Sequence, residues 1–236
     1  MPTNKLILWD IDHTLIETGG VGSEVFKDAF EQVTGRKIDQ LADVTGRTEP
    51  IIFRETLHLY GIGDPGDYFP RFVEAQAAGY RARADEMRRR GRALPGAREA
   101  LAAFAELPHI TQTVLTGNPE PSAIAKLETF DLAHYLELDI GAYGTDDPVR
   151  PNLVAIAQAR AAQRHGHTYT RETTYVIGDT TSDVEAALKG GAQIIAVASG
   201  KTTPDELRKA GASTVIEDLV GTQRLFQLFT SSASLP

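Results

Sequence analysis

A short apolar run near the N-terminus, residues 5–9 (KLILW), constrains the fold more than any other part of the sequence. Every residue after the lysine is apolar, which predicts a strand buried on both faces of a parallel sheet. Asp10 and Asp12 follow this run, separated by one residue. Ligands bind at the carboxyl ends of strands in open α/β sheets, so these carboxylates are candidate functional groups. The alternative interpretation is a turn rich in aspartate.

Beyond residue 96 the chain alternates short apolar runs with helical patterns. This alternation predicts an α/β fold, a doubly wound and mostly parallel Rossmann-like sheet with right-handed crossovers. Further strands are expected at 110–115, 135–141, 174–177, 193–198 and 214–216. Helices are expected at 97–106, 121–130, 152–164, 182–189, 205–210 and 219–229, before a frayed tail at 230–236.

Residues 18–90 show a different pattern, because helical periodicity occurs there without a convincing strand. Helices are expected at 23–33, 51–59 and 68–90, with Ser23 as the N-cap of the first one. The segment directly follows the first strand and is therefore predicted to be an inserted all-helical cap. The α/β core then comprises residues 1–17 and 91–236, and the cap comprises residues 18–90.

Composition narrows the classes of function. The 236 residues include 24 Lys+Arg and 32 Asp+Glu, a formal net charge of −8, which argues against a general nucleic-acid binder. The absence of cysteine excludes disulfides, thiolate zinc sites and a cysteine nucleophile. No run approaches the ~20 apolar residues of a membrane span, and no secretory leader is visible. We therefore expect a cytoplasmic monomer or homodimer with no nucleic-acid or membrane partner.

Polar residues follow two more of the predicted core strands. Thr116 ends the second run, and Asp179 ends a later one, with Asp183 four residues further on. The carboxyl ends of parallel strands meet at one edge of the sheet, so these residues are expected to gather near the first pair of aspartates. Several carboxylates in one crevice repel one another unless a cation offsets them, and hard oxygen donors favour Mg²⁺. Arg150, before a predicted helix, offers further positive charge.

Four segments, in this order along the chain, resemble the four motifs of the haloacid dehalogenase superfamily. They are DIDHT at 10–14, LTGN at 115–118, Arg150 and GDTTSD at 178–183. Any one of them is a weak signal, whereas four in order at strand ends make a specific one. The helical insertion is similar to the cap of the phosphoglycolate phosphatase and β-phosphoglucomutase branch.

This resemblance implies Mg²⁺-dependent hydrolysis of a small phosphorylated metabolite, a phosphomonoester such as phosphoglycolate. It implies that Asp10 is the nucleophile that forms an aspartyl-phosphate, and that Asp12 is the general acid and then the general base. The implied Mg²⁺ ligands are Asp10, Asp179, Asp183 and the main-chain carbonyl of Asp12.

The resemblance also implies which groups contact the phosphate and the substrate. Thr116 and the backbone N–H of Gly117 are expected to bind phosphoryl oxygens, and Thr14 and Asn118 belong to the same phosphate and substrate site. Arg47, in the cap loop TGRTEP, is the candidate for contacting the far end of the substrate.

One position departs from the family pattern. The family places a lysine where this chain has Arg150, which is planar and bidentate rather than a compact charge. Lys201 is a rival source of the positive charge, although the helix-start position favours Arg150. Two alternatives to a phosphatase stay open: a phosphomutase of the same branch, and a non-catalytic regulator that binds a phosphorylated ligand.

Overall fold

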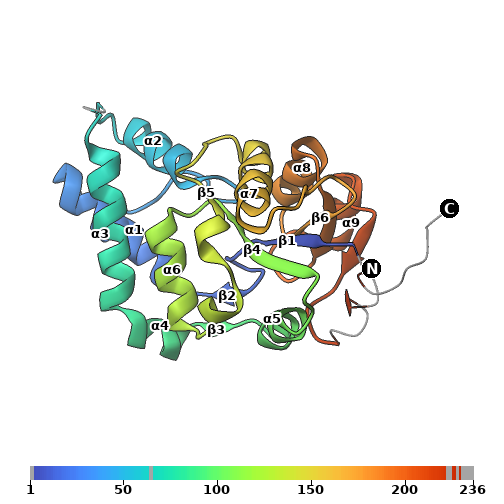
Figure 1. Ribbon diagram of the computed structural model, residues 1–236. Helices are drawn as coiled ribbons and strands as arrows, with labels where there is room; N and C mark the ends of the chain where they lie inside the picture. The colour runs from blue at the N-terminus through green and yellow to red at the C-terminus, as the bar shows by residue number, and fades with distance from the viewer. Residues whose placement is uncertain (1–2, 64–65, 222–224, 227–228, 230–236) are drawn as a thin grey trace.

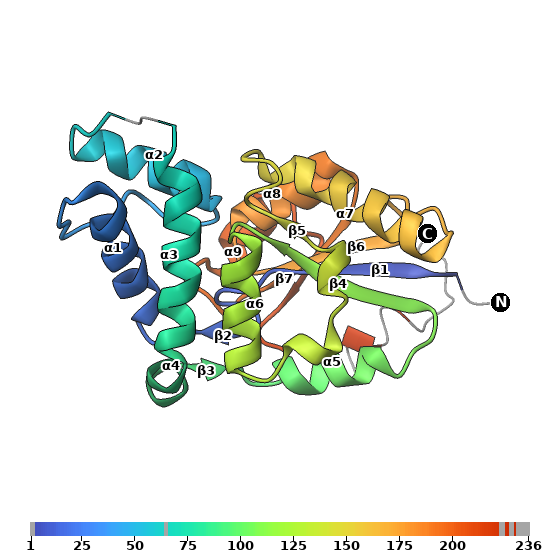
Figure 2. The ribbon, with the colours of Figure 1, turned by 60° about the vertical axis from the view of Figure 1, so that its left-hand side comes forward.

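The computed structural model describes residues 3–63, 66–221, 225–226 and 229. The early helical segment, blue to cyan in Figure 1, forms a group beside the sheet and its covering helices. Figure 2, turned by 60°, separates the two parts more clearly, with the helical group on the left. No helix in the described ranges is long and apolar enough to span a membrane.

The larger part is built on a six-stranded sheet in which every neighbouring pair of strands is parallel. This architecture confirms the predicted α/β fold class. From one edge to the other, the strands are β5 (Ala142–Tyr143), β4 (Ile110–Thr116), β1 (Lys5–Trp9), β6 (Thr174–Gly178), β7 (Gln193–Val197) and β8 (Thr214–Ile216).

Strand β1 lies inside the sheet, between β4 and β6. Both of its faces are covered. Successive side chains of a strand point to opposite faces, so Ile7 and Trp9 join one buried cluster while Leu6 and Leu8 join the other. All four are 0% exposed. The Trp9 indole N–H donates to the side-chain oxygen of Gln112 at 3.1 Å, which satisfies its polar atom.

The helices of this part are distributed between those two clusters. Helices α5 (Ala97–Ala105) and α6 (Glu120–Thr129) cover the Trp9 face. The opposite face is covered by α7 (Arg150–His165), α8 (Thr181–Gly190) and α9 (Pro204–Lys209). The carboxyl ends of β1, β4 and β6, where the polar residues lie, are therefore between two helical layers. They are at the edge of the sheet that faces the inserted helices.

The inserted helices have a hydrophobic core of their own. They are α1 (Val21–Thr34), α2 (Glu49–Leu59), α3 (Tyr68–Ala82) and α4 (Ala84–Arg90). The rings of Phe26, Phe30, Phe53 and Phe72 contact one another in this cluster. A two-stranded antiparallel ribbon, β2 (Ile16–Glu17) with β3 (Arg92–Ala93), carries the chain into and out of the insertion. Residues 18–63 and 66–90 contain no strand, as expected.

Two expectations for the inserted helices were wrong in detail. Helix α1 begins at Val21 rather than after Ser23, because Gly20 turns the chain with φ 87° and the Thr18 hydroxyl accepts from the backbone N–H of Gly22. The single helix expected at 68–90 is two helices, broken at Arg83, whose backbone (φ −104°, ψ 19°) is not helical.

The strand expected at 135–141 was also wrong. Residues Ala133–Tyr135 and Leu138–Ile140 are 3₁₀ turns, and the short edge strand follows at β5. Short apolar runs do not separate strand from other buried structure by pattern alone. A helix is expected at 219–229, but residues 219–221 form bends, and part of the remaining range lies outside the described residues. The tail at 230–236 lies entirely outside them.

Candidate active site

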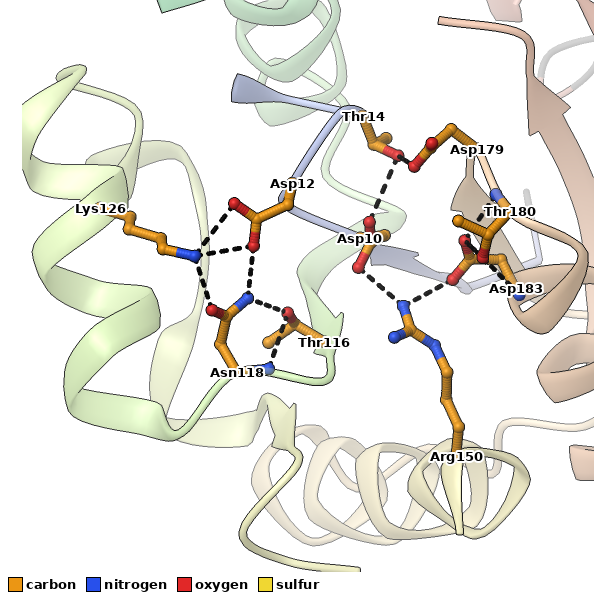
Figure 3. Close-up of polar contacts among 10 residues, drawn as sticks. All are labelled: Asp10, Asp12, Thr14, Thr116, Asn118, Lys126, Arg150, Asp179, Thr180 and Asp183. Atoms are coloured by element: carbon orange, nitrogen blue, oxygen red, sulfur yellow. Dashed lines mark hydrogen bonds and ion pairs between the residues drawn. The ribbon is translucent and has the colours of Figure 1, made fainter. Parts of the chain in front are cut away.

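Three carboxylates gather where β1 and β6 end. Asp10 follows β1, Asp179 follows β6, and Asp183 lies in the first turn of α8. One carboxylate oxygen from each lies within 4.8 Å of the others (Figure 3). The residues are 6%, 2% and 0% exposed, respectively. The expected gathering of Asp10, Asp179 and Asp183 is therefore present in the structure.

Asp183 is held in place by its own helix. Its Oδ2 accepts from the backbone N–H and the hydroxyl of Thr180, while the Thr180 hydroxyl accepts from the Asp183 N–H. This reciprocal arrangement is a capping box, which satisfies the orphan N–H groups at the start of α8. It leaves Asp183 Oδ1 available to Arg150.

Arg150 lies between two of these carboxylates. It is the first residue of α7, and one guanidinium nitrogen donates to Asp10 Oδ1 at 2.7 Å and to Asp183 Oδ1 at 2.6 Å. The Arg150 Nε–H is buried and has no hydrogen-bond partner within the described part of the chain. Lys201 lines the same cavity, but the ion pairs to Asp10 and Asp183 come from Arg150.

The three carboxylates have too little positive charge around them. Burial and the negative charge of Asp183 raise the pKa of Asp10 well above its usual range, although Arg150 opposes the rise. Burial and Asp183 raise the pKa of Asp179 to about 7, although Thr14 opposes this by donating to Asp179 Oδ1 at 3.1 Å. Three clustered carboxylates that share one guanidinium fit a divalent cation such as Mg²⁺, which would add the missing positive charge.

Asp12 lies in different surroundings. Its carboxylate turns away from the other three and accepts from Lys126 Nζ at 3.0 and 2.8 Å and from Asn118 Nδ2 at 2.8 Å (Figure 3). Burial alone would raise the pKa of Asp12, but the charge and hydrogen bonds of Lys126, together with Asn118, lower it. The carboxylate group of Asp12 is thus separate from the acidic cluster, which leaves its main-chain carbonyl as the predicted metal ligand.

Lys126 is a site residue that the sequence analysis missed. It comes from α6, its side chain is 5% exposed, and it also donates to Asn118 Oδ1 at 2.7 Å. The ring centroid of Tyr80, from the inserted helix α3, lies 4.9 Å from its Nζ. The available signal was a lysine three residues after Ala123, on the apolar face of a predicted core helix.

The end of β4 supplies Thr116, Gly117 and Asn118. The Thr116 hydroxyl accepts from the Asn118 side chain at 2.7 Å, so the two residues brace each other. A Cβ on Gly117 would lie 2.3 Å from the Arg47 carbonyl oxygen, so only glycine allows the cap loop to approach this strand end. The Arg47 guanidinium, however, pairs with Glu55 and with Asp43 at 3.7 Å.

A cavity of about 430 Å³ lies where the inserted helices meet the sheet edge. Its core side includes Asp10, Asp12, Thr116, Arg150 and Asp179, and its cap side includes Arg47, Glu49 and apolar residues. Thr14 and Asp183 lie behind this lining, where they support Asp179 and Arg150. The cavity is of the size that small-molecule sites have.

The geometry agrees with what the chain resembles. The model of the haloacid dehalogenase-like hydrolase family matches residues 7–188. The chain belongs to this family. A search of curated proteins found no match to the chain.

Several solved structures of this family have the same fold. A hydrolase from Pseudomonas syringae is 21% identical, with a TM-score of 0.69 over 96% of this chain and 99% of that one. A predicted phosphoglycolate phosphatase from Haemophilus somnus is 17% identical, with a TM-score of 0.68 over 96% and 100%. A candidate β-phosphoglucomutase from Thermotoga maritima is 20% identical, with a TM-score of 0.59 over 95% and 99%. This haloacid dehalogenase-like chain thus shares its fold with phosphatase-like and phosphomutase-like relatives.

Proposed function

We propose that this haloacid dehalogenase-like protein hydrolyses small phosphomonoesters in a Mg²⁺-dependent reaction through an aspartyl-phosphate. The observation that carries the proposal is the arrangement around Asp10. Its carboxylate shares an acidic cluster with Asp179 and Asp183, and it contacts Arg150, whose buried Nε–H has no partner among the residues that the structure describes. A phosphoryl oxygen is a suitable acceptor for that N–H, because arginine binds phosphate through several parallel donors.

In the first step an oxygen of Asp10 attacks phosphorus in line. A bond forms between Asp10 and phosphorus, the bond to the alcohol oxygen breaks, and the electron pair leaves with that oxygen, which takes a proton from Asp12. Asp12 must therefore take up this proton when the substrate binds, because Lys126 and Asn118 lower its pKa in the free site. In the second step Asp12, now ionised, removes a proton from water. The water oxygen bonds to phosphorus, the aspartyl bond breaks, and inorganic phosphate and free Asp10 are released.

Positive charge at the phosphoryl group is the main electrostatic requirement of both steps. Asp10, Asp179 and Asp183, with the main-chain carbonyl of Asp12, would hold Mg²⁺, which when bound supplies charge that offsets the phosphoryl oxygens. Arg150, which donates to Asp10, supplies a second positive charge. In this proposal Thr116 and the backbone N–H of Gly117, at the end of β4, would donate to the phosphoryl oxygens.

Lys126 has a positioning role in this proposal. Its two hydrogen bonds to Asp12 fix that carboxylate on the side of Asn118, away from the metal cluster. A general acid and base must be held within hydrogen-bond reach of the leaving oxygen and the water, so the orientation of Asp12 matters as much as its charge. The ring of Tyr80 from the cap lies on the other side of Lys126, with its centroid 4.9 Å from Nζ.

The test is hydrolysis of p-nitrophenyl phosphate by the purified protein. We expect release of p-nitrophenolate with Mg²⁺, loss of activity with EDTA, and recovery on adding Mg²⁺ back. Asp10→Asn should abolish turnover with an unchanged circular dichroism spectrum. Asp139→Asn, the same change at an exposed position outside the cavity, is the matched control.

Two outcomes would replace the proposal with another function. Binding of phosphate esters without any turnover would favour a regulator that binds a phosphorylated ligand. Conversion of β-glucose 1-phosphate to the 6-phosphate, faster than release of inorganic phosphate, would favour a phosphomutase. Phosphoglycolate belongs in the same panel as the substrate named for one structural relative.

A further inference from the structure

The cap end of the cavity holds a carboxylate that the phosphoryl chemistry does not use. Glu49 is the first residue of α2 and lines the cavity together with apolar residues of the cap, among them Phe26, Leu41 and Ile52. Its backbone N–H donates to the Gly117 carbonyl at 2.8 Å, which ties this end of the helix to the core. The side chain therefore faces the substrate space from the side opposite to the sheet.

Glu49 forms no ion pair with any residue that the structure describes, and its side-chain hydrogen bond comes from a neutral amide. Its Oε1 accepts from the amide of Gln76, and the Gln76 oxygen in turn accepts from the Ser122 hydroxyl at 2.9 Å. Neither partner is charged. Burial raises the pKa of Glu49, while the charge of Lys126 and the Gln76 hydrogen bond oppose the rise. Lys126 itself is already bound to Asp12 and Asn118.

Two other cations of the cavity pair with carboxylates elsewhere. Arg47 pairs with Glu55 and Asp43 in the cap, and Arg150 pairs with Asp10 and Asp183 in the core. The backbone next to Lys201 approaches the acidic cluster, because a Cβ on Gly200 would lie 1.8 Å from an Asp179 oxygen. A substrate with an anionic tail would thus meet a carboxylate and apolar walls at the cap end. A buried carboxylate is stabilised by a cationic partner.

We propose that the alcohol portion of the substrate carries a protonated amine that binds against Glu49. This inference rests on the proposed phosphatase function and names the substrate class: phosphate esters of amino alcohols. The phosphate would occupy the Arg150 end of the cavity, and the ammonium group would complete the hydrogen bonding of Glu49, in a cavity whose lining also includes Phe26 and Tyr80. An aromatic ring next to a carboxylate is a favourable site for such a cation.

The experiment compares phosphate esters that differ only in the terminal group. Aminoalkyl, hydroxyalkyl and carboxyalkyl phosphates with two-carbon and three-carbon chains are assayed for phosphate release with Mg²⁺, and phosphoglycolate is the shortest carboxylated member. At the better chain length, kcat/KM for the amine should exceed that for the alcohol by about tenfold and that for the carboxylate by about 100-fold, because a charged hydrogen bond is gained in one case and a repulsion in the other.

Glu49→Gln isolates the contribution of the charge, because glutamine can still accept from Gln76. The ratio of kcat/KM for the amine to that for the carboxylate should fall at least about tenfold in this variant. Glu74→Gln is the matched control, since Glu74 is an exposed glutamate of the cap outside the cavity lining. That control should keep the ratio of the wild-type protein.

Two results would overturn the inference: preference of the wild-type protein for the carboxyalkyl ester, or an unchanged ratio in Glu49→Gln. Failure of the phosphatase proposal is recognised separately, by the absence of p-nitrophenyl phosphate hydrolysis with Mg²⁺. In that case calorimetric titration of the Asp10→Asn protein with the same esters still decides the matter. Tighter binding of the aminoalkyl ester supports the amine site, and tighter binding of the carboxyalkyl ester contradicts it.

Discussion

Asp10 and Asp12 lie two residues apart in one loop, yet their surroundings are electrostatically opposite. Asp10 shares a single guanidinium with Asp183, and burial together with Asp183 raises its pKa. Asp12 has the ammonium of Lys126 beside it and a hydrogen bond from Asn118, and its pKa is lowered in spite of burial. The same short segment therefore carries one carboxylate, Asp10, that lacks a cation of its own, and another, Asp12, whose negative charge is balanced by Lys126.

This difference separates two tasks that a single type of side chain performs. A carboxylate in an acidic cluster is stabilised by an added cation. This suits a residue that binds a metal ion and acts as the nucleophile. A carboxylate paired with its own lysine is already balanced, and its orientation can serve proton transfer. The predictions below test whether the two environments correspond to two separate chemical steps.

The largest expected effect comes from replacing Asp10 or Asp12, because each replacement should block a different step of the reaction. Asp10→Asn should lower turnover of p-nitrophenyl phosphate by more than about 10⁴-fold, because no aspartyl-phosphate can form. Asp12→Asn should instead release about one p-nitrophenolate per protein in a burst, because this leaving group needs no proton while the second step needs a base. Rapid-quench or stopped-flow measurement of the burst distinguishes them. Identical kinetics in the two variants would show that the environments do not divide the reaction.

The next effect concerns the cation beside Asp10. Arg150→Ala should lower kcat/KM by about 10²–10³-fold, because it removes positive charge from the phosphoryl group. Lys201→Ala should cost less, and Arg150→Lys should keep part of the activity, since it keeps the charge without the fork of donors. Steady-state assays with Mg²⁺ in excess test all three variants. A larger loss from Lys201→Ala would show that Lys201, and not Arg150, supplies the positive charge at the phosphoryl group.

A smaller effect is expected at the cation beside Asp12. Lys126→Met should lower kcat by about 10–100-fold, and the second step should slow more than the first because the base is no longer oriented. A burst of p-nitrophenolate is the diagnostic readout, since a general loss of structure lowers both steps together. Lys126→Arg should restore part of the rate. Lys189→Met, at an exposed lysine of α8, is the matched control for stability.

The smallest effect is on stability in the absence of metal. Asp179 has a pKa of about 7 in the folded protein, against about 3.9 for an unfolded aspartate. Between these values the unfolded chain is ionised while the folded carboxyl keeps its proton, so the free energy of unfolding should fall as pH rises from about 4 to 7 and then level off. A loss of about 1–3 kcal/mol is expected.

Urea unfolding of EDTA-treated protein at pH 5 and pH 8 measures this loss. Asp179→Asn should show a smaller difference between the two pH values, because the titrating group is gone. Added Mg²⁺ should raise the unfolding midpoint more at pH 8 than at pH 5, since the ligands must lose their protons to bind a cation. Equal stabilisation at both pH values would argue against a metal at this cluster.

Several of the site residues found from the sequence follow strands of a parallel sheet. The edge at which Asp10, Thr116 and Asp179 meet is a consequence of strand direction, so their proximity is predictable once the strands are recognised. Arg150 was recognised through its place at the start of a helix and its resemblance to a family motif. These residues needed no knowledge of how helices pack.

Lys126 and Glu49 could not be found in the same way. Each belongs to a helix, and its role depends on the tertiary contact between the inserted helices and the core. A single charged residue in a helical pattern is ordinarily exposed, so the pattern carries no information about a buried partner 114 residues away, as for Lys126 and Asp12. The break at Arg83 and the short strand β5 were missed for a related reason, because local periodicity does not encode the surrounding packing.

The ribbon of β2 and β3 has an architectural consequence. Ile16 pairs with Ala93 and Glu17 with Arg92, so the chain leaves the sheet and returns to it at adjacent points. The two ends of the insertion are held together by this strand pairing. Its length and sequence can therefore vary while the strand register on either side is preserved. Replacement of residues 18–91 by a tight turn would close the same ribbon as an ordinary hairpin. A chain of this kind can acquire a new selectivity by exchanging one module while leaving its chemistry untouched.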